Sequence, residues 1–197
     1  MKRILFLLLC LASTFVHAEA GSSVPATAWG LPQLMQSLAQ AQSSQGSFVE
    51  RKHLAVLDVP LTSSGTMLFR APDHLEKHTL APREENLVLN QGVLTIDDKA
   101  RNVKHTLVLQ QYPAVWALVE SIRSTLAGDQ TMLERFYKVE LKGNAAQWHM
   151  QLLPLEKRMR TMVSEIVIAG QGNRVHSIEM REANGDHSTM TLIEDMP

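Results

Sequence analysis

The chain has 197 residues, of which 45% are hydrophobic and 20% are charged, so it can bury a core and is too weakly charged for a disordered chain. Its 19 lysines and arginines against 20 acidic residues give a formal charge of −1, and no basic run offers a strip for phosphates, which argues against nucleic acid as a partner. The single cysteine excludes a disulfide framework, a cysteine-rich metal centre and a CxxC redox site.

The N-terminal segment has the pattern of an export signal. Lys2 and Arg3 precede an uncharged apolar stretch, Ile4 to Val16, and small residues suited to signal peptidase follow it. As a helix this stretch would span roughly 20 Å, short of the roughly 30 Å hydrocarbon layer of a bilayer, so a permanent anchor is the weaker interpretation. We therefore expect a cleaved signal peptide over residues 1–18, with cleavage after Ala20 as the alternative.

Cleavage at either position removes Cys10, which is the single thiol of the chain. A cysteine-free exported chain suits an oxidising compartment, and we expect the bacterial periplasm. Residues 19–28 are expected to form a linker rich in small residues, and residues 29–197 a single domain that is not an integral membrane protein.

A first amphipathic helix is expected from Leu31 to the residue before Ser43. Its apolar residues recur at spacings of three and four, which places Leu34, Met35 and Leu38 on one face. Short β-rich runs separated by proline, glycine and Asx turn residues then predict six strands. These strands are expected at Ser47–Asp58, Gly65–Arg70, Leu75–Leu80, Asn86–Asn90, Val93–Asp97 and Lys104–Leu109.

A second amphipathic helix is expected from Pro113 to a C-terminal cap at Gly128. The residues of its apolar face include Val115, Leu118, Val119 and Ile122. Five more strands follow, and the turn Asn184-Gly185-Asp186 between the last two has the strongest hairpin chemistry in the chain. These strands are expected at Arg135–Leu141, Gln147–Leu153, Met162–Ala169, Val175–Glu182 and Ser188–Glu194.

Together these elements predict an α+β fold. Eleven strands with short connections should pair antiparallel in sequential order as a curved meander, because a parallel sheet needs a crossover helix between its strands. About eight strands already enclose a filled barrel, so eleven imply an open, strongly curved, incomplete barrel whose concave face is covered by the amphipathic helices. Such an arrangement can leave an apolar cavity between the sheet and the helices.

The inward-facing strand positions are the candidate wall of that cavity, and the apolar faces of the two helices are its candidate lid. Methionine is frequent among these positions, and its flexible thioether side chain adapts to ligands of variable shape, such as acyl chains. The alternative interpretation is that the same residues fill an ordinary core. The strand residues of this candidate site are Met67, Phe69, Trp148, Met150, Leu152, Ile178, Met180, Met190 and Leu192.

The sequence predicts no catalytic constellation, metal site or cofactor. It has no GxSxG or HExxH motif and no glycine-rich phosphate loop. Glu50 and His53 have the chemistry of an acid and a base, but no nucleophile or orienting group accompanies them. His74 and His78 lie where a turn leads into a strand, so solvated or locally bonded histidines are favoured over metal ligands.

A cationic run follows Pro154. The segment Glu156-Lys157-Arg158-Met159-Arg160 carries three cations within four positions. Such a run attracts anionic lipid headgroups, at on the order of 1 kcal/mol for each cation. A solvated loop is the favoured interpretation, and headgroup contact is the alternative.

Three segments carry a resemblance to a known family: the strand GSFVE that begins at Gly46, the strand GTMLFR that begins at Gly65, and the segment APDHL that begins at Ala71. Their order after a leader and an amphipathic helix resembles the periplasmic outer-membrane lipoprotein carrier (LolA) family, over nearly the whole chain that follows the leader. The resemblance implies an open eleven-stranded barrel with a helical lid, which shields lipoprotein acyl chains between the inner and outer membranes. It therefore implies a carrier rather than an enzyme.

Two departures from the family pattern are visible. The family has an arginine immediately before the proline of that motif, which links barrel to lid, whereas this chain has Ala71. Arg70, one residue earlier, is the candidate for a lid-linking or headgroup-binding residue. The family also continues past its last long strand, whereas this chain ends at Pro197.

The closer likeness is to divergent LolA-like proteins found beside fatty-acid-type, aryl-polyene or glycolipid export systems. It implies a carrier of a lipidic product, with an inner-membrane donor and an outer-membrane acceptor protein as partners. Three alternatives are a pathway enzyme acting through Glu50, His53 and Arg70, a lipid-sensing regulator, and a structural adaptor with a filled core.

Overall fold

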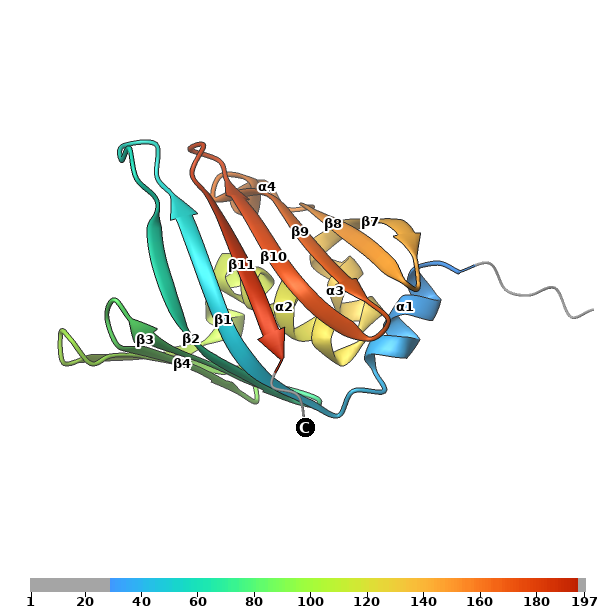
Figure 1. Cartoon of the computed structure of the whole chain (residues 1–197), viewed down its shortest axis with the longest axis horizontal. Helices are drawn as coiled ribbons and strands as arrows, with labels where there is room; N and C mark the ends of the chain where they lie inside the picture. Colours follow the sequence, from blue (N-terminus) through green and yellow to red (C-terminus); the bar gives the residue numbers. More distant parts are fainter. Residues whose placement is uncertain (1–28, 195–197) are drawn as a thin grey trace, which may run out of the picture.

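The computed structural model describes residues 29–194. The expected signal peptide and linker, residues 1–28, lie outside the described residues. The described chain forms one antiparallel sheet of eleven strands that is strongly curved and not closed into a barrel, with the longer helices on one face (Figure 1). The predicted α+β class and the open antiparallel sheet are therefore confirmed.

The strand order differs from a sequential meander. The sheet runs β6-β5-β4-β3-β2-β1-β11-β10-β9-β8-β7, so the first and last strands pair at its centre and two consecutive strands form its edges. The physical reason is the helical segment between β6 and β7, which crosses the concave face from one edge of the sheet to the other. The strands are β1 Ser43–His53, β2 Leu61–Arg70, β3 His74–Ala81, β4 Glu85–Asn90, β5 Val93–Asp98, β6 Val103–Val108, β7 Tyr137–Asn144, β8 Gln147–Pro154, β9 Val163–Gln171, β10 Arg174–Glu182 and β11 His187–Glu194.

The first strand begins and ends earlier than predicted. It starts at Ser43, where the first helix was expected to end, because Ser43 pairs with Arg70 and the ladder to β2 continues from there. It stops at His53, since the apolar residues that follow leave the sheet and form a loop. Tertiary pairing has overridden local sequence preference at both ends.

The long helix α2, Pro113–Ala127, has the boundaries that the sequence predicts. Proline occupies its first turn, and Gly128 caps its C-terminus with φ of 66°, a left-handed conformation that glycine adopts at little cost. A Cβ atom at Gly128 would collide with the backbone carbonyl of Met35, so this glycine also allows the first helix to approach the end of α2.

The other helices differ from the prediction. Helix α1 covers only Leu31–Leu38, and helices α3, Gln130–Phe136, and α4, Lys157–Arg160, were not expected. Asp129 caps α3 by accepting a hydrogen bond from the Met132 backbone amide at 3.0 Å, so the strand expected from Arg135 starts two residues later. A 3₁₀ turn, η1 Leu109–Gln111, precedes α2, and none of the described helices is long and apolar enough to cross a bilayer.

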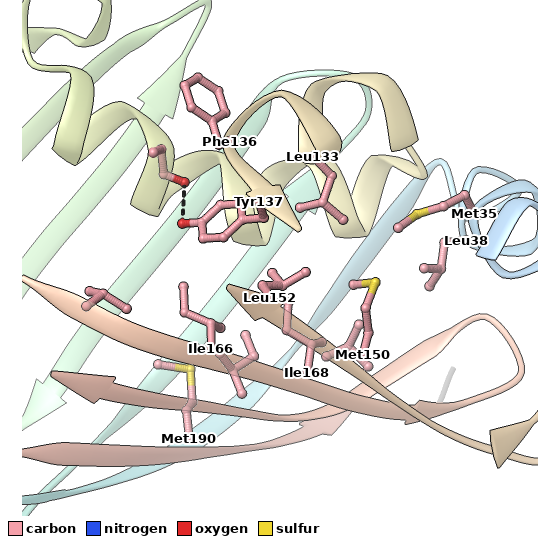
Figure 2. Close-up of a cluster of buried hydrophobic side chains, with 14 of the residues drawn as sticks. Met35, Leu38, Leu133, Phe136, Tyr137, Met150, Leu152, Ile166, Ile168 and Met190 are labelled. Carbon is pink, nitrogen blue, oxygen red and sulfur yellow. Dashed lines mark hydrogen bonds between the residues drawn. The ribbon is translucent and has the colours of Figure 1, made fainter. Parts of the chain in front are cut away.

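The main core lies where α1, α2 and α3 meet strands β7 to β10. Figure 2 shows side chains from these elements, such as Met35, Leu133 and Leu152, converging between the helices and the sheet. Tyr137 contributes its ring and donates a hydrogen bond to the Ala117 carbonyl at 3.0 Å, and burial raises the pKa of this phenol. A second, smaller cluster contains Leu89, Leu94 and Leu109 and lies under the N-terminal part of α2.

Candidate functional site

A cavity of about 300 Å³ lies between α2 and the concave face of the sheet. Its helical side is the predicted apolar face of α2, because residues three and four apart project in one direction. Eight of the sequence-predicted site residues line it: Met67, Val115, Leu118, Val119, Ile122, Ile178, Met180 and Met190. The strands add five aliphatic residues that the prediction missed: Leu75, Leu87, Leu89, Leu94 and Ile166.

The missed residues come mainly from β3, β4 and β5. On the inner face of these strands, Leu75 and Leu87 are half-buried, whereas Leu89 and Leu94 are buried. Strict alternation of apolar and polar residues is weak in β4, where Leu87, Val88 and Leu89 follow one another. Alternation alone therefore could not assign a face to these residues.

One ion pair interrupts the aliphatic wall. Lys77 Nζ lies 2.7 Å from Glu50 Oε2, and both side chains line the cavity. The ammonium group also lies 4.9 Å from the centre of the Phe48 ring, which favours a cation near its face. Mutual pairing offsets the cost of holding these two charges beside an apolar space. The cavity thus has a mainly aliphatic wall, and its polar members are this ion pair and the side chains of Ser121 and Ser188.

A second cavity of about 460 Å³ lies at the opposite end of β1, beside the C-terminal end of α1. Its wall combines Leu38, Phe69 and Leu192 with a polar run from Gln40 to Ser47, so it is far more polar than the cavity under α2. Met67 lines both cavities. The aliphatic cavity is the better match for hydrocarbon, although it is the smaller of the two.

The remaining predicted site residues lie in the packed core, outside the walls of both cavities. Trp148, Met150 and Leu152 are 0% exposed, and Leu34 and Met35 of α1 pack against the same cluster. These positions do face inward as alternation predicts. They belong to the core cluster that side chains of α1 and α3 complete on this side of the concave face.

Arg123 of α2 ties the helices to the sheet. It is buried, and it donates hydrogen bonds to the Pro72 carbonyl at 2.8 Å, to Glu120 at 2.6 Å and to Asp129 at 3.0 Å. Burial by itself favours the neutral form, but the two carboxylates outweigh it and raise the pKa of Arg123. One guanidinium therefore joins α2, the cap of α3 and the turn between β2 and β3.

The predicted lid-linking residue does not make this connection. Arg70 is exposed at the end of β2, whereas Arg123 approaches the same turn from the helix. Sequence reasoning missed Arg123 because an arginine on an amphipathic helix normally belongs to its solvated face. The available signal was its spacing from Glu120, three residues before it, which pairs side chains on a helix.

His74 and His78 are bonded to neighbouring side chains. His74 Nε2 and His78 Nε2 each lie 2.6 Å from the Glu76 carboxylate, and His78 Nδ1 lies 2.9 Å from the Asn86 side chain. The bond to Glu76 raises the pKa of His78, and the bonds from His78 and then His74 lower the pKa of Glu76. Within residues 29–194, no group of three or more His, Cys, Asp or Glu side chains is placed to hold a metal ion.

The three residues considered for catalysis are not brought together. Glu50 lines the cavity, whereas His53 stacks on His187 where β1 ends. Ser63 of β2 pairs with Glu50, and Arg70 lies seven residues farther along β2. Arg70 is therefore roughly 23 Å along the strand from the position opposite Glu50. The arrangement offers a compartment for an apolar ligand and no shared reaction centre for these side chains.

The family model for LolA-like outer membrane lipoprotein carrier proteins matches residues 23–195. No curated protein matches the chain significantly. A LolA superfamily protein from Nitrosomonas europaea has 11% identity and a TM-score of 0.45, with 85% of this chain and 93% of that chain covered.

Two further solved structures are similar to the chain. The MucA/MucB complex of Pseudomonas aeruginosa gives 13% identity and a TM-score of 0.48, covering 82% of this chain and 55% of that chain. An outer membrane lipoprotein-sorting protein domain from Vibrio parahaemolyticus gives 7% identity and a TM-score of 0.46, covering 82% and 88%.

Proposed function

The chain belongs to the LolA-like family of outer membrane lipoprotein carrier proteins, and from this premise we propose that it carries an acyl chain in the cavity under α2. The observation that carries the proposal is the aliphatic wall shared by α2 and seven strands beside it. Its volume of about 300 Å³ lies at the lower end of the roughly 300–1,000 Å³ range of small-molecule sites. The cargo we propose is therefore a lipid or acylated product that inserts one chain.

Burial of hydrocarbon supplies the driving force in this proposal. An acyl chain that leaves a membrane exchanges one apolar surrounding for another, and the cavity keeps it from water at roughly 0.8 kcal/mol for each methylene. The cavity is bounded by α2, so a movement of this helix away from the sheet would widen the cavity for entry and release. The contacts of Arg123 with the Pro72 carbonyl and Asp129 are the ones that such a movement would break.

We further propose that the chain works in the periplasm, between an inner-membrane donor and an outer-membrane acceptor. The apolar stretch after Lys2 and Arg3 supports export, and the family supports a carrier role. The separation of Glu50, His53 and Arg70 gives the enzymatic alternative no support.

Binding of a fluorescent fatty acid to the delipidated protein tests the proposal. We expect saturable binding in the micromolar range or tighter, accompanied by the emission increase of a fluorophore that leaves water. Val119→Trp should fill part of the cavity and weaken binding at least about tenfold, because the added ring occupies the space of the ligand.

Val49→Trp is the matched control, since Val49 is exposed on the outer face of β1. The control should bind like the original protein, and both variants should unfold cooperatively. Absence of saturable uptake by the original protein, or equal uptake by Val119→Trp, would reject an acyl-chain site in this cavity.

A further inference from the structure

Three connections meet at one end of the sheet. Figure 1 shows that the β1–β2 and β10–β11 connections and α4 lie on the same side of the molecule, where these strands end. The Ala55 amide donates to Asp186 Oδ1 at 2.8 Å, and the Ala183 amide donates to the Met162 carbonyl at 3.0 Å. The connections are residues 54–60, 155–162 and 183–186, and we call them together the loop end.

Aliphatic side chains stand exposed on the loop end. Val56 is 87% exposed and Val59 71%, and Leu61, which follows the same loop, is 52% exposed. The second connection adds Leu155 at 49% and Met162 at 48%. None of these residues lines either cavity described above. Apolar residues gathered on projecting loops mark a surface that meets an apolar partner.

Cations lie beside this apolar surface. Helix α4 is fixed to the core by Met159, which is 3% exposed, and this leaves Lys157, Arg158 and Arg160 exposed on the other sides of the helix. Among the described residues, none of these three cations has a carboxylate within 4.0 Å. With Glu156 included, the segment 156–160 keeps a net positive charge, whereas the other two connections of the loop end each carry one carboxylate, Asp58 and Asp186. The positive charge of the loop end is therefore concentrated on α4.

We propose that the loop end docks onto the surface of an anionic lipid bilayer. The aliphatic tips would enter the boundary between headgroups and acyl chains, while the cations of α4 meet the phosphates. The surface is made of convex loops on three separate connections, and a fluid bilayer adapts to such a shape without a complementary groove. Asp58 lies between Leu57 and Val59 on the tip, and its charge limits the depth of contact.

This inference goes beyond the proposed carrier function, because fatty-acid uptake from solution does not require a membrane contact. The cavity wall nevertheless reaches toward the same end. Glu50 lies three residues before the end of β1, and Ser188 is the second residue of β11. A protein docked by its loop end would hold that part of the cavity near the bilayer surface.

Co-sedimentation with lipid vesicles tests the inference. The exported protein, its N-terminus read by mass spectrometry, is mixed with vesicles of phosphatidylethanolamine and phosphatidylglycerol or of phosphatidylcholine alone. We expect stronger binding to the anionic vesicles. The double variant Val56→Ser/Val59→Ser should lose at least about tenfold in affinity, because two exposed aliphatic groups no longer leave water.

Charge variants give a second, independent readout. Arg158→Gln should weaken binding roughly fivefold, and Asp58→Asn should strengthen it by a similar factor, since each changes one charge at an anionic surface. Ile193→Ser and Lys142→Gln are the matched controls. Both residues are exposed and lie away from the loop end, on β11 beside Ser47 and near the β7–β8 turn. These controls should bind within about twofold of the original protein.

The possible outcomes separate the two proposals. Fatty-acid uptake should be unchanged in every loop-end variant, so a failure of uptake bears on the cavity and a failure of vesicle binding bears on the loop end. No binding to anionic vesicles, or equal binding by the double serine variant, would overturn the membrane contact. Binding only to vesicles that contain a membrane protein, or self-association through the loop end, would overturn it in favour of a protein partner.

Discussion

The two halves of the concave face are built from the same alternating strands but have different interiors. Under β7 and β8, the side chains of Trp148 and Leu152 are fully buried in the core cluster that side chains of α1 and α3 complete. Under β3 to β5, only α2 and the turn before it approach the sheet, and residues such as Leu87 and Val119 border open space. A solid core and a cavity are thus neighbours within one sheet.

The difference shows how the covering helices bound the aliphatic cavity of this fold. A strand presents one apolar face whether or not a helix lies on it. Three helices converge on one half of the face, whereas α2 alone covers the other half and leaves the aliphatic cavity beneath it. The half with less cover is the half with the aliphatic cavity, whereas the cavity beside α1 is the more polar one.

The largest expected effect is on the contact that joins the two halves. Arg123→Leu removes the donor that links the β2–β3 turn to α2 and to the cap of α3, and it leaves the buried Glu120 carboxylate without its ion-pair partner. We expect a loss of about 3–4 kcal/mol in the free energy of unfolding, measured by urea denaturation. Arg70→Leu, at an exposed arginine, should change it by less than about 0.5 kcal/mol. A small effect of Arg123→Leu would show that the helices are held by apolar packing alone.

A matched pair of leucines tests the contrast between the halves. Leu152→Ala should cost about 3 kcal/mol of unfolding free energy, because it opens a hole in a packed core. Leu118→Ala borders a cavity that already exists, and we expect a cost of about 1 kcal/mol. Fatty-acid binding should weaken only in Leu118→Ala. Equal costs for the two substitutions would contradict the assignment of solid and hollow halves.

The smallest effect concerns the hydrogen bonds of Glu76 with His74 and His78. None of these three residues lines the two cavities. Bonding to Glu76 raises the pKa of His78 above 6.5, so this stabilisation is present at lower pH and is lost as pH rises through the folded-state value. The pKa of Glu76 is lowered below 4.5, so its contribution is lost as pH falls through its own folded-state value. The network should therefore stabilise most between about pH 4.5 and 6.5.

Glu76→Gln measures that contribution. The difference in unfolding free energy from the original protein should be about 0.5–1 kcal/mol near pH 5.5 and should decline as the pH rises through the folded-state pKa of His78, because this side chain then loses its proton. Glu84→Gln, at an exposed carboxyl group, is the control and should show no such pH window. A difference that grows toward pH 8 would contradict the assigned direction of the His78 shift.

Much of the fold is readable from the sequence because its signals are local. Pro113 and Gly128 mark the ends of α2, and glycine, proline and Asx residues mark most strand boundaries. The pairing of β1 with β11 has no local signal. It depends on the helices crossing the concave face, and therefore on contacts between residues far apart in the sequence.

The candidate site is predictable only in part for the same reason. Alternation correctly places Met67, Met190 and Trp148 on the inner face, but it carries no information about what lies above them. Trp148 meets packed side chains, whereas Met190 meets the cavity. Arg123 was missed because its burial results from the docking of α2, which the amphipathic pattern of the helix does not reveal.

The most direct test of the acyl-chain cavity uses the methionines, because both halves of the concave face contain them. In a protein labelled with ¹³C at the methionine methyl groups, fatty acid should shift the NMR signals of Met67, Met180 and Met190, which line the cavity. The signals of Met35 and Met150, packed in the solid half, should stay nearly constant. Shifts confined to the packed methionines, or no shift at saturating fatty acid, would contradict an acyl-chain site under α2.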